Sequence, residues 1–324
     1  MISSKRILDS LPNVLRTIDL RELGEKHQGK VRDFYITPDK RITITTDRQS
    51  AFDVNLGYIP YKGAVLNQLA DFWFDKTKKV VPNHMISVPD PNVLVSKQCK
   101  NIPVEMIVRG YLSGSTKTSV WYSYDKGERE IYGIRFPDGM KKNQKLVNPI
   151  ITPTTHPEAG SKLHDERLTR DQIIKEGIFD KKLYEQMEKV SLELFEIGSK
   201  WCKEHGIILV DTKYEFGLYD GKLTLIDEIH TPDSSRFWIE KTYQERFDRG
   251  LEPENFDKEF FRLWYSEKGY RGDGQPPKMT NELIVQTAQR YISIYEKITG
   301  KKFNAFEYPI EKRIKENLKK ARII

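Results

Sequence analysis

Residues 207–228 read IILVDTKYEFGLYDGKLTLIDE, and this stretch decides the fold because two β-rich runs flank Asp220-Gly221. Asp-Gly between such runs is a strong signal for a β-hairpin. Side chains alternate along a strand, so Asp211, Lys213 and Glu215 lie on one face. The apolar residues between them then face a core. The sequence therefore predicts a sheet with one packed face and one face that carries charge.

The length of the hairpin turn decides which carboxylate faces Lys213. A two-residue turn would place Glu228 opposite this lysine, whereas a three-residue turn that begins at Tyr219 places Asp227 there, diagonal to Glu215. We predict the three-residue turn, because it brings two carboxylates and a lysine together, an arrangement suited to Mg²⁺ that carries a nucleotide phosphate. The alternative is a solvated strand face with a cross-strand ion pair.

Composition limits the class of protein. The chain has 324 residues, 38% hydrophobic and 31% charged, and this length predicts a large core and two packed lobes. No stretch is apolar enough to span a bilayer or to form a signal core. Cys99 and Cys202 are far apart and have no metal-ligand spacing, so we expect a reducing cytoplasm.

The net charge of +7 and the pI near 9.0 indicate anionic partners. The positive charge is spread along the chain rather than gathered in blocks. This distribution argues against a nucleic-acid-binding protein and favours small phosphorylated substrates. ATP-dependent kinases and carboxylate–amine ligases are two classes of enzyme that act on such substrates.

Four stretches contain candidate anion-binding residues. Lys30 and Arg32 follow Gly29 at the start of a predicted hairpin, where amides and an ammonium can contact phosphates, although this is no Walker A loop. Arg109 ends a predicted buried strand and precedes a small-residue loop, so it is either a phosphate clamp or part of a structural ion pair. Arg236 lies in a predicted polar loop at 231–238, which we expect to leave the sheet. Residues 47–53 form another predicted polar loop, whose two aspartates and one arginine either shape a turn or contact the substrate.

The rest of the chain divides into helices and one long irregular span. Apolar spacing predicts a core helix at 64–74, further helices at 256–264 and 280–299, and a terminal helix with basic residues on its exposed face. Asp180 caps a predicted helix that ends near His205. Residues 119–157 are loop-rich and predict a functional cover or a small subdomain. They lead to His164, which is either part of an acid/base cluster or a surface residue.

Several of these motifs together resemble the SAICAR synthetase (phosphoribosylaminoimidazole-succinocarboxamide synthase) family. Residues 102–115, with Val108-Arg109 and Ser113-Gly114-Ser115, resemble its first signature, and residues 208–217 resemble its second. Residues 29–33, 47–53, 227–236 and 256–264 are similar in order and spacing. The resemblance extends from about residue 24 to residue 295, and the length is similar to that of the longer form of the family.

The resemblance implies an ATP-dependent ligase of purine biosynthesis. It would join carboxyaminoimidazole ribonucleotide (CAIR) to L-aspartate, giving SAICAR, ADP and phosphate, with an acyl phosphate as the simplest intermediate. It implies an α+β fold with ATP in a cleft between a β-rich lobe at 1–110 and an α/β lobe at 111–270. We expect helices of 271–324 to pack on the central lobe, and a monomer or a small homo-oligomer that binds neither nucleic acid nor membrane.

The resemblance also implies roles for individual residues. Glu215 and Asp227 would hold Mg²⁺ on the ATP phosphates, with Lys213 beside them and Asp211 orienting Lys213 or a metal-bound water. Further ATP-binding positions are Lys30, Arg32, Glu105 and Met106, the last two through backbone groups at the adenine edge. Arg109, Ser115 and Arg236 would grip CAIR. Candidates for contacts with L-aspartate are Ser50, Asp53, Lys162 and His164.

Overall fold

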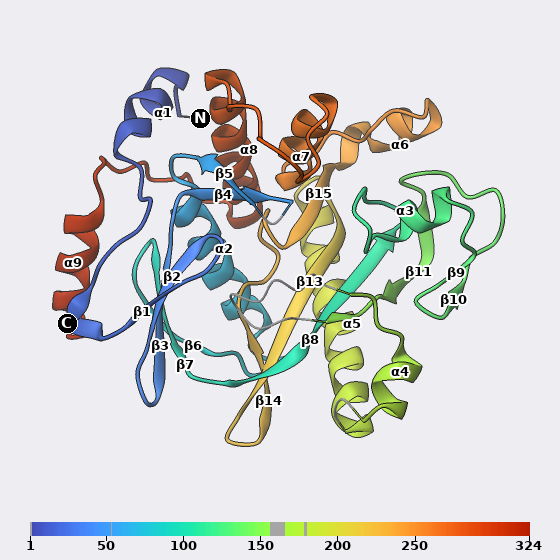
Figure 1. The fold of residues 1–324 in the computed structure, drawn as a ribbon, viewed down its shortest axis with the longest axis horizontal. Helices are drawn as coiled ribbons and strands as arrows, with labels where there is room; N and C mark the ends of the chain where they lie inside the picture. The colour runs from blue at the N-terminus through green and yellow to red at the C-terminus, as the bar shows by residue number, and fades with distance from the viewer. Residues whose placement is uncertain (1, 53, 156–165, 178–179) are drawn as a thin grey trace.

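The computed structural model describes residues 2–52, 54–155, 166–177 and 180–324. Asp53, Lys162 and His164, predicted as substrate-binding residues, lie outside these ranges. Two antiparallel sheets stand side by side, with helices on their outer faces (Figure 1). Strands and helices are segregated rather than alternating in βαβ units, so the predicted α+β class is confirmed.

The N-terminal sheet is five-stranded in the described residues, with the order β1-β2-β3-β7-β6. Its strands are β1 (Lys26–Gln28), β2 (Arg32–Ile36), β3 (Lys40–Thr45), β6 (Met85–Asp90) and β7 (Val93–Lys97). The predicted hairpin is β2–β3. Ile42 and Ile44 pack on one face beneath α9 (Glu311–Lys320), whereas Arg41, Thr43 and Thr45 point to the opposite face, where the cleft lies.

The second sheet is built on two long strands, β8 (Lys100–Tyr111) and β13 (Ile207–Tyr219). Strands β11 (Lys145–Ile151) and β12 (Thr154–Thr155) pair with the outer edge of β8. Strands β14 (Lys222–Ile226) and β15 (Ser235–Ile239) pair with the outer edge of β13. The largest core cluster joins this sheet to α2 (Lys62–Thr77), α5 (Lys181–Glu204) and α8 (Asn281–Thr299).

The predicted helices α5 and α8 begin at residues whose side chains cap them. The Asp180 side chain accepts a hydrogen bond from the Leu183 amide at the start of α5, and Thr280 caps α8 in the same way. The described chain also contains shorter elements around the two sheets: α1 (Ser4–Ser10), η1 (Leu11–Asn13), η2 (Arg21–Leu23), β4 (Arg48–Ala51), β5 (Val54–Tyr58), α4 (Arg170–Lys175), α6 (Glu240–Asp248) and α7 (Lys258–Glu267). None of the described helices is long and apolar enough to cross a membrane.

The loop-rich span after Ser119 forms a small subdomain with its own core. It contains α3 (Val120–Asp125), β9 (Glu130–Ile131) and β10 (Ile134–Arg135). Its buried side chains form a separate apolar cluster: Leu112, Val120, Tyr124, Ile131, Tyr132, Phe136 and Leu146. The aromatic members supply enough apolar area for a local core where periodicity in the sequence is weak.

The prediction of a three-residue turn in the hairpin of β13 and β14 is wrong. Tyr219 pairs with Lys222 across a two-residue turn, and both turn residues are left-handed, with φ of 50° at Asp220 and 72° at Gly221. Such a primed turn matches the twist of the two strands. The ladder then ends at the pair of Glu215 with Ile226.

Asp227 nevertheless reaches Lys213, for a different reason. Its φ of 62° turns the chain out of β14, so the strand register no longer decides where its side chain lies. The Asp227 Oδ2 atom lies 3.7 Å from the Lys213 Nζ atom, and Glu228 turns instead to Arg32, at 2.7 Å. The expected neighbours are therefore assembled by a backbone turn after the strand.

Four further expectations differ from the structure. Arg236 is on strand β15, not in a loop, because Ser235–Ile239 continue the sheet beside β13. The predicted polar loop at 47–53 contains β4, which pairs with β5. The sheets divide at Gln98-Cys99, earlier than residue 110, and the apolar side of α9 packs on the N-terminal sheet rather than on the central lobe.

Candidate active site

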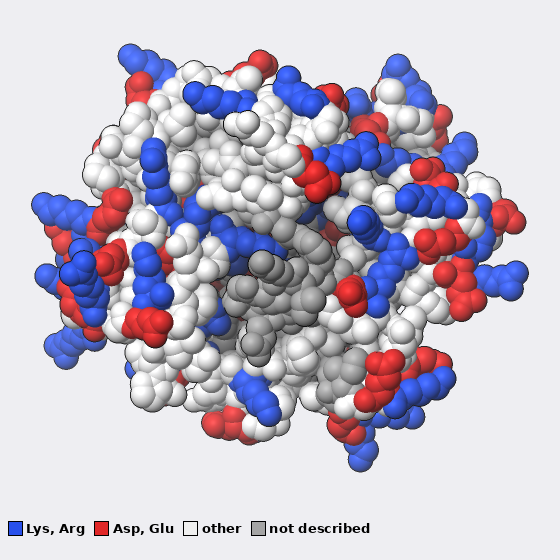
Figure 2. Space-filling view, viewed as in Figure 1, with Lys and Arg blue, Asp and Glu red and all other residues white. Residues whose placement is uncertain are grey.

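A cleft of about 1450 Å³ lies between the two sheets. Its ceiling is the inner face of the N-terminal sheet, and its floor is formed by alternate residues of β8 and β13. Loops before β15 and the start of α7 close one end. Figure 2 shows Lys and Arg side chains inside the hollow at the centre of this face. These walls bring residues that are distant in sequence into one basic cavity.

The first charged group on the floor is the Lys213 cluster, formed by Lys213, Glu105, Glu215 and Asp227. Glu215 and Glu105 are paired in the register of β13 with β8. The Lys213 Nζ atom lies 3.1 Å from Glu105 Oε1, forms an ion pair with Glu215, and is 3.7 Å from Asp227 Oδ2. Burial opposes the charge on Lys213, but the three carboxylates outweigh it and hold the lysine pKa well above its ordinary value.

Arg32 links the Lys213 cluster to the ceiling. Its Nη1 atom lies 3.0 Å from Asp227 Oδ1, and its Nη2 atom lies 2.7 Å from Glu228 Oε2. Burial alone would raise the pKa of Asp227, but Arg32 and then Lys213 hold it below the usual range for a carboxyl group. Asp227 is therefore an ionised oxygen donor at neutral pH.

The Lys213 cluster has donor atoms that fit Mg²⁺. Its carboxylates converge from three segments on a single positive charge. In the part of the chain that the structure describes, no group of three or more His, Cys, Asp or Glu residues could hold a metal by itself. Mg²⁺ takes oxygen ligands and usually binds one or two carboxylates together with waters and substrate phosphates. The residues therefore fit an ion that arrives with a nucleotide.

Asp211 sits between two arginines at the next position along the floor. The strand registers place it opposite Arg109 on β8 and Arg236 on β15. Its Oδ2 atom lies 2.5 Å from Arg236 Nη1 and 3.5 Å from both Arg109 Nη1 and Ser113 Oγ. The prediction was that Asp211 orients Lys213 or a metal-bound water. Its hydrogen bonds within the described residues go to Arg109, Arg236 and Ser113, because β8 and β15 both pair with β13 at this position.

Arg109 and Arg236 are held by further contacts. Arg109 donates from Nε to Thr152 Oγ1 at 2.8 Å and from Nη2 to the Thr118 carbonyl at 3.0 Å. Arg236 Nη2 lies 3.5 Å from Glu259 Oε2, whose other oxygen accepts from Ser115 at 2.9 Å. Burial would raise the pKa of Glu259, but Arg236 and Arg262 lower it to about 2. The two guanidinium groups are thus fixed in place before any ligand binds.

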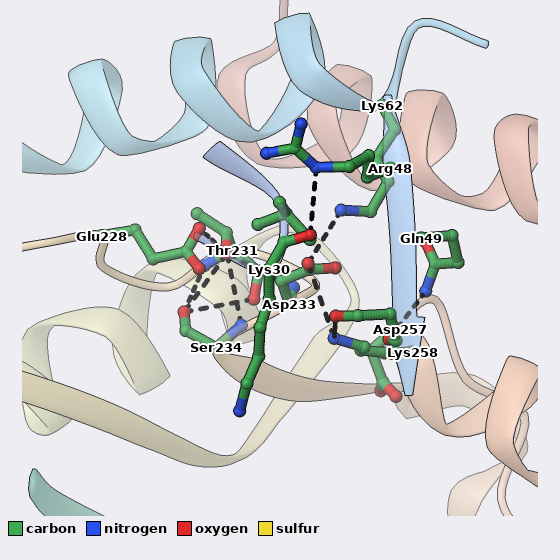
Figure 3. Close-up of polar contacts among 12 residues, drawn as sticks. Lys30, Arg48, Gln49, Lys62, Glu228, Thr231, Asp233, Ser234, Asp257 and Lys258 are labelled. Carbon is green, nitrogen blue, oxygen red and sulfur yellow. Dashed lines mark hydrogen bonds and ion pairs between the residues drawn. The ribbon is translucent and has the colours of Figure 1, made fainter. Parts of the chain in front are cut away.

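A second charged group, the Asp233 cluster, was not predicted from the sequence (Figure 3). It consists of Asp233, Lys62 and Lys258. Asp233 Oδ2 lies 2.8 Å from Lys62 Nζ and 3.7 Å from Lys258 Nζ, while Oδ1 accepts from the Tyr291 hydroxyl at 2.6 Å. Lys62 is fully buried at the start of α2. Two cations therefore face one carboxylate: Asp233 and Lys258 line the end of the cleft, and Lys62 is buried behind its wall.

Burial sets unusual protonation equilibria next to this cluster. It lowers the pKa of Lys258 to about 8, against the attraction of Asp233, and Arg262 and Lys62 lower it further. It raises the pKa of the neighbouring Asp257 to about 7, although that carboxylate accepts from the amides of Phe237 and Glu259. Both groups titrate near neutral pH, as is common at functional sites.

Most of the predicted site residues share this cleft. Those that line it are Lys30, Arg32, Ser50, Glu105, Arg109, Asp211, Lys213, Glu215, Asp227 and Arg236. Met106 points away from it, because alternation places its fully buried side chain in the core. Ser115 is not part of the lining but contacts Glu259 at its edge.

The residues missed from the sequence are Lys62, Asp233, Lys258 and Glu259. Lys62 begins a helix that we recognised only for its core, and Lys258 and Glu259 begin one whose aromatic residues dominated the pattern. Asp233 lies within residues 227–236, which resemble the family, but the only predicted anion-binding residue near it was Arg236. No local spacing connects residue 62 with residues 233 and 258.

Comparison with known proteins identifies the family. The SAICAR synthetase family model matches residues 25–278. A phosphoribosylaminoimidazole-succinocarboxamide synthase from Legionella pneumophila (strain Paris) is 51% identical over 92% of this chain and 95% of its own. A chloroplastic one from Arabidopsis thaliana is 46% identical over 97% of this chain and 78% of its own.

Solved structures agree with the sequence comparison. A SAICAR-synthase from Saccharomyces cerevisiae complexed with SAICAR matches with a TM-score of 0.76 and 30% identity, covering 90% of this chain and all of the other. A SAICAR synthetase in complex with ADP matches with a TM-score of 0.66 and 26% identity, covering 87% of this chain and all of the other. Sequence, fold and the charged cleft lead to the same conclusion: the chain belongs to the SAICAR synthetase family.

Proposed function

We propose that the two charged clusters divide the work of an ATP-dependent ligation between them. The chain catalyses the joining of CAIR and L-aspartate to SAICAR, with conversion of ATP to ADP and phosphate. The observation that carries the division is that one cleft holds an acid-rich cluster beside a base-rich one. The acid-rich side faces Mg·ATP, and the base-rich side faces the anionic substrates.

The nucleotide half of the site lies between the N-terminal sheet and the Lys213 cluster. Glu215 and Asp227 would hold Mg²⁺, which neutralises phosphate charge when bound. Lys30 and Arg32 line the ceiling above them and would contact the phosphates. Gln98 lies at the link between the sheets, and its buried Oε1 atom has no hydrogen-bond partner among the described residues. It can accept a hydrogen bond from the adenine amino group, near Glu105 and the backbone of Met106.

The substrate half is built on fixed cations. Arg109 and Arg236 would bind the phosphate or carboxylate of CAIR, because forked guanidinium groups match such anions. Lys258 continues this positive surface along α7 and donates a hydrogen bond to Ser50 at 3.2 Å. Asp53, Lys162 and His164 remain candidates for contacts with L-aspartate.

The chemistry needs the CAIR carboxylate to be activated before it meets an amine. A carboxylate oxygen of CAIR attacks the γ-phosphorus of ATP, the bond to the β-phosphate oxygen breaks, and ADP leaves. The amine nitrogen of L-aspartate then attacks the acyl carbon, phosphate departs, and the nitrogen loses its proton. Lys213 stays protonated because of its carboxylates, so it can neutralise charge on the transferring phosphoryl group.

The surroundings of the reaction are also part of the proposal. The substrates are small and anionic, so the cleft needs neither nucleic acid nor a membrane. We propose a cytoplasmic enzyme that acts as a monomer or a small homo-oligomer.

The direct test measures phosphate release from Mg·ATP with CAIR, with and without L-aspartate. We expect sustained release only with both substrates, together with SAICAR detected by mass spectrometry. A burst of phosphorylated CAIR without L-aspartate would support the acyl phosphate. Sustained release without L-aspartate, or no SAICAR from protein that binds ADP, would overturn the proposed reaction.

A further inference from the structure

Arg41 is a basic residue of the cleft ceiling that neither the resemblance nor the reaction has used. It lies on β3, opposite Ile36 on β2 and Ser96 on β7. Its neighbours Ile42 and Ile44 point into the core beneath α9. Alternation therefore directs Arg41 to the opposite face, where it lines the cleft between the sheets.

An aromatic residue holds the Arg41 guanidinium over the cleft. Its Cζ atom lies 3.7 Å from the centre of the Phe34 ring on β2. From the strand on the other side, His27 stacks on the same ring, with centroids 5.1 Å apart and planes within 13°. Stacking on a ring orients a guanidinium and leaves its edge donors available for hydrogen bonds.

The Arg41 guanidinium is partly buried but has no acceptor in the part of the chain that the structure describes. Within the described residues, its side chain makes no hydrogen bond and no ion pair, whereas Arg32 beside it contacts both Asp227 and Glu228. Burial lowers the pKa of Arg41, and Asp227 and Glu215 are the acids that oppose this effect. Arg41 thus carries unused donors within electrostatic range of the Lys213 cluster.

We propose that Arg41 donates hydrogen bonds to phosphate oxygens of the bound nucleotide, with Phe34 holding the guanidinium plane in position. This inference rests on the nucleotide site proposed above. A phosphate is the ligand that matches these observations, because a desolvated guanidinium with several free donors pairs best with a polyanion. Arg41 would then complete the ceiling contacts begun by Lys30 and Arg32.

The test compares Arg41→Met with Lys40→Met by isothermal titration. Lys40 is the preceding residue of the same strand and is exposed, so it controls for charge on the hairpin. The two ligands are Mg·ADP and inorganic triphosphate, which shares the phosphates but lacks the base. We expect Arg41→Met to lower the affinity for both ligands by roughly tenfold or more, the scale of a lost charge-assisted hydrogen bond. Lys40→Met should leave both unchanged.

Three further readouts separate binding from folding. The melting temperature of ligand-free Arg41→Met should be unchanged or higher, because the substitution removes a partly buried, unpaired charge. Arg41→Lys, which keeps the charge but loses the fork, should fall between the wild type and Arg41→Met in both affinities. The KM for ATP should rise in Arg41→Met while the KM for CAIR stays constant.

The outcomes distinguish this inference from the proposed nucleotide site. Unchanged ADP affinity in Arg41→Met, with a wild type that binds ADP, would overturn the role of Arg41 alone. A loss of ADP affinity without a loss of triphosphate affinity would overturn it in favour of a contact with the base. A wild-type protein that binds neither ligand would overturn the nucleotide site and the role of Arg41 together.

Discussion

The Lys213 cluster and the Asp233 cluster share one cleft but have opposite balances of charge. In the first, three carboxylates surround one ammonium. In the second, two ammonium groups approach one carboxylate. An excess of acid attracts a metal ion, whereas an excess of base attracts the phosphate and carboxylate groups of substrates. In the proposed function, each half of the cleft would therefore select the ligand of opposite charge.

Geometry strengthens the contrast. The members of the Lys213 cluster lie on or next to neighbouring strands of one sheet, so register sets most of their spacing. The Asp233 cluster instead joins the starts of α2 and α7 with the turn before β15. It depends on the packing of three separate segments.

Removing the ammonium of the Lys213 cluster should give the largest effect. In Lys213→Met, three carboxylates face the transferring phosphoryl group without the lysine charge, although Asp227 keeps Arg32 as a cationic partner. We expect kcat to fall roughly 100-fold or more, the scale of losing one electrostatic donor. Steady-state phosphate release measures it, and Lys222→Met, exposed on the same hairpin, is the control and should stay within about twofold of wild type. A Lys213→Met enzyme with near-normal kcat would remove this cluster from the chemistry.

The arginines between the two clusters should affect substrate binding more than turnover. Arg236→Met and Arg109→Ala should each raise the KM for CAIR by roughly tenfold or more, corresponding to about 1.5–3 kcal/mol for a charge-assisted hydrogen bond. The KM for ATP should change little, and Arg249→Met, at the exposed residue that follows α6, serves as a control. An unchanged KM for CAIR in Arg109→Ala would exclude that residue from the CAIR site.

Asp257, beside the Asp233 cluster, should make stability depend on pH. Burial raises its pKa from 3.8 in the unfolded chain to about 7 in the fold, so between these values only the native state holds the proton. The free energy of unfolding should therefore rise by about 1.4 kcal/mol for each pH unit below 7. The increase ends near pH 3.8, where the unfolded chain also binds the proton. Urea unfolding from pH 8 to pH 5 should show this slope as a difference between wild type and Asp257→Asn.

A matched substitution checks the assignment of that slope. Asp248→Asn changes an exposed aspartate at the end of α6 and should leave the slope as in the wild type. If wild type and Asp257→Asn keep a constant difference in unfolding free energy across this pH range, Asp257 does not retain a proton in the fold.

The sequence predicted that Lys213 and Glu215 lie together because a strand has a fixed period. It did not predict Glu105 beside them, since that residue was expected at the adenine edge and its position follows from the pairing of β8 with β13. Asp211, Lys213 and Glu215 share a face whatever the turn, so an error in turn length left the floor of the cleft intact. The prediction that Asp227 lies beside Lys213 rested on a wrong turn length. Its side chain lies there because the backbone of Asp227 is left-handed and leaves the strand register. The assignment of Arg236 to a loop failed because its segment begins with turn-forming residues before it joins the sheet.

The Asp233 cluster could not be derived in the same way. Lys62 and Lys258 each begin a helix, and nothing in local periodicity shows that two helix starts meet at one aspartate. The burial of Lys62 is a consequence of packing α2 against α8 and the second sheet. The overall fold was accessible because signatures along most of the chain resembled one family.

The central claim is that the two clusters bind different ligands, and one pair of variants tests it most directly. The measurement is the concentration of Mg²⁺ and of CAIR required for half-maximal phosphate release in Glu215→Gln and in Lys258→Gln. We predict that Glu215→Gln raises the requirement for Mg²⁺ alone, whereas Lys258→Gln raises the requirement for CAIR alone. Equal effects of both variants on both ligands, or the reverse assignment, would contradict the division of the cleft.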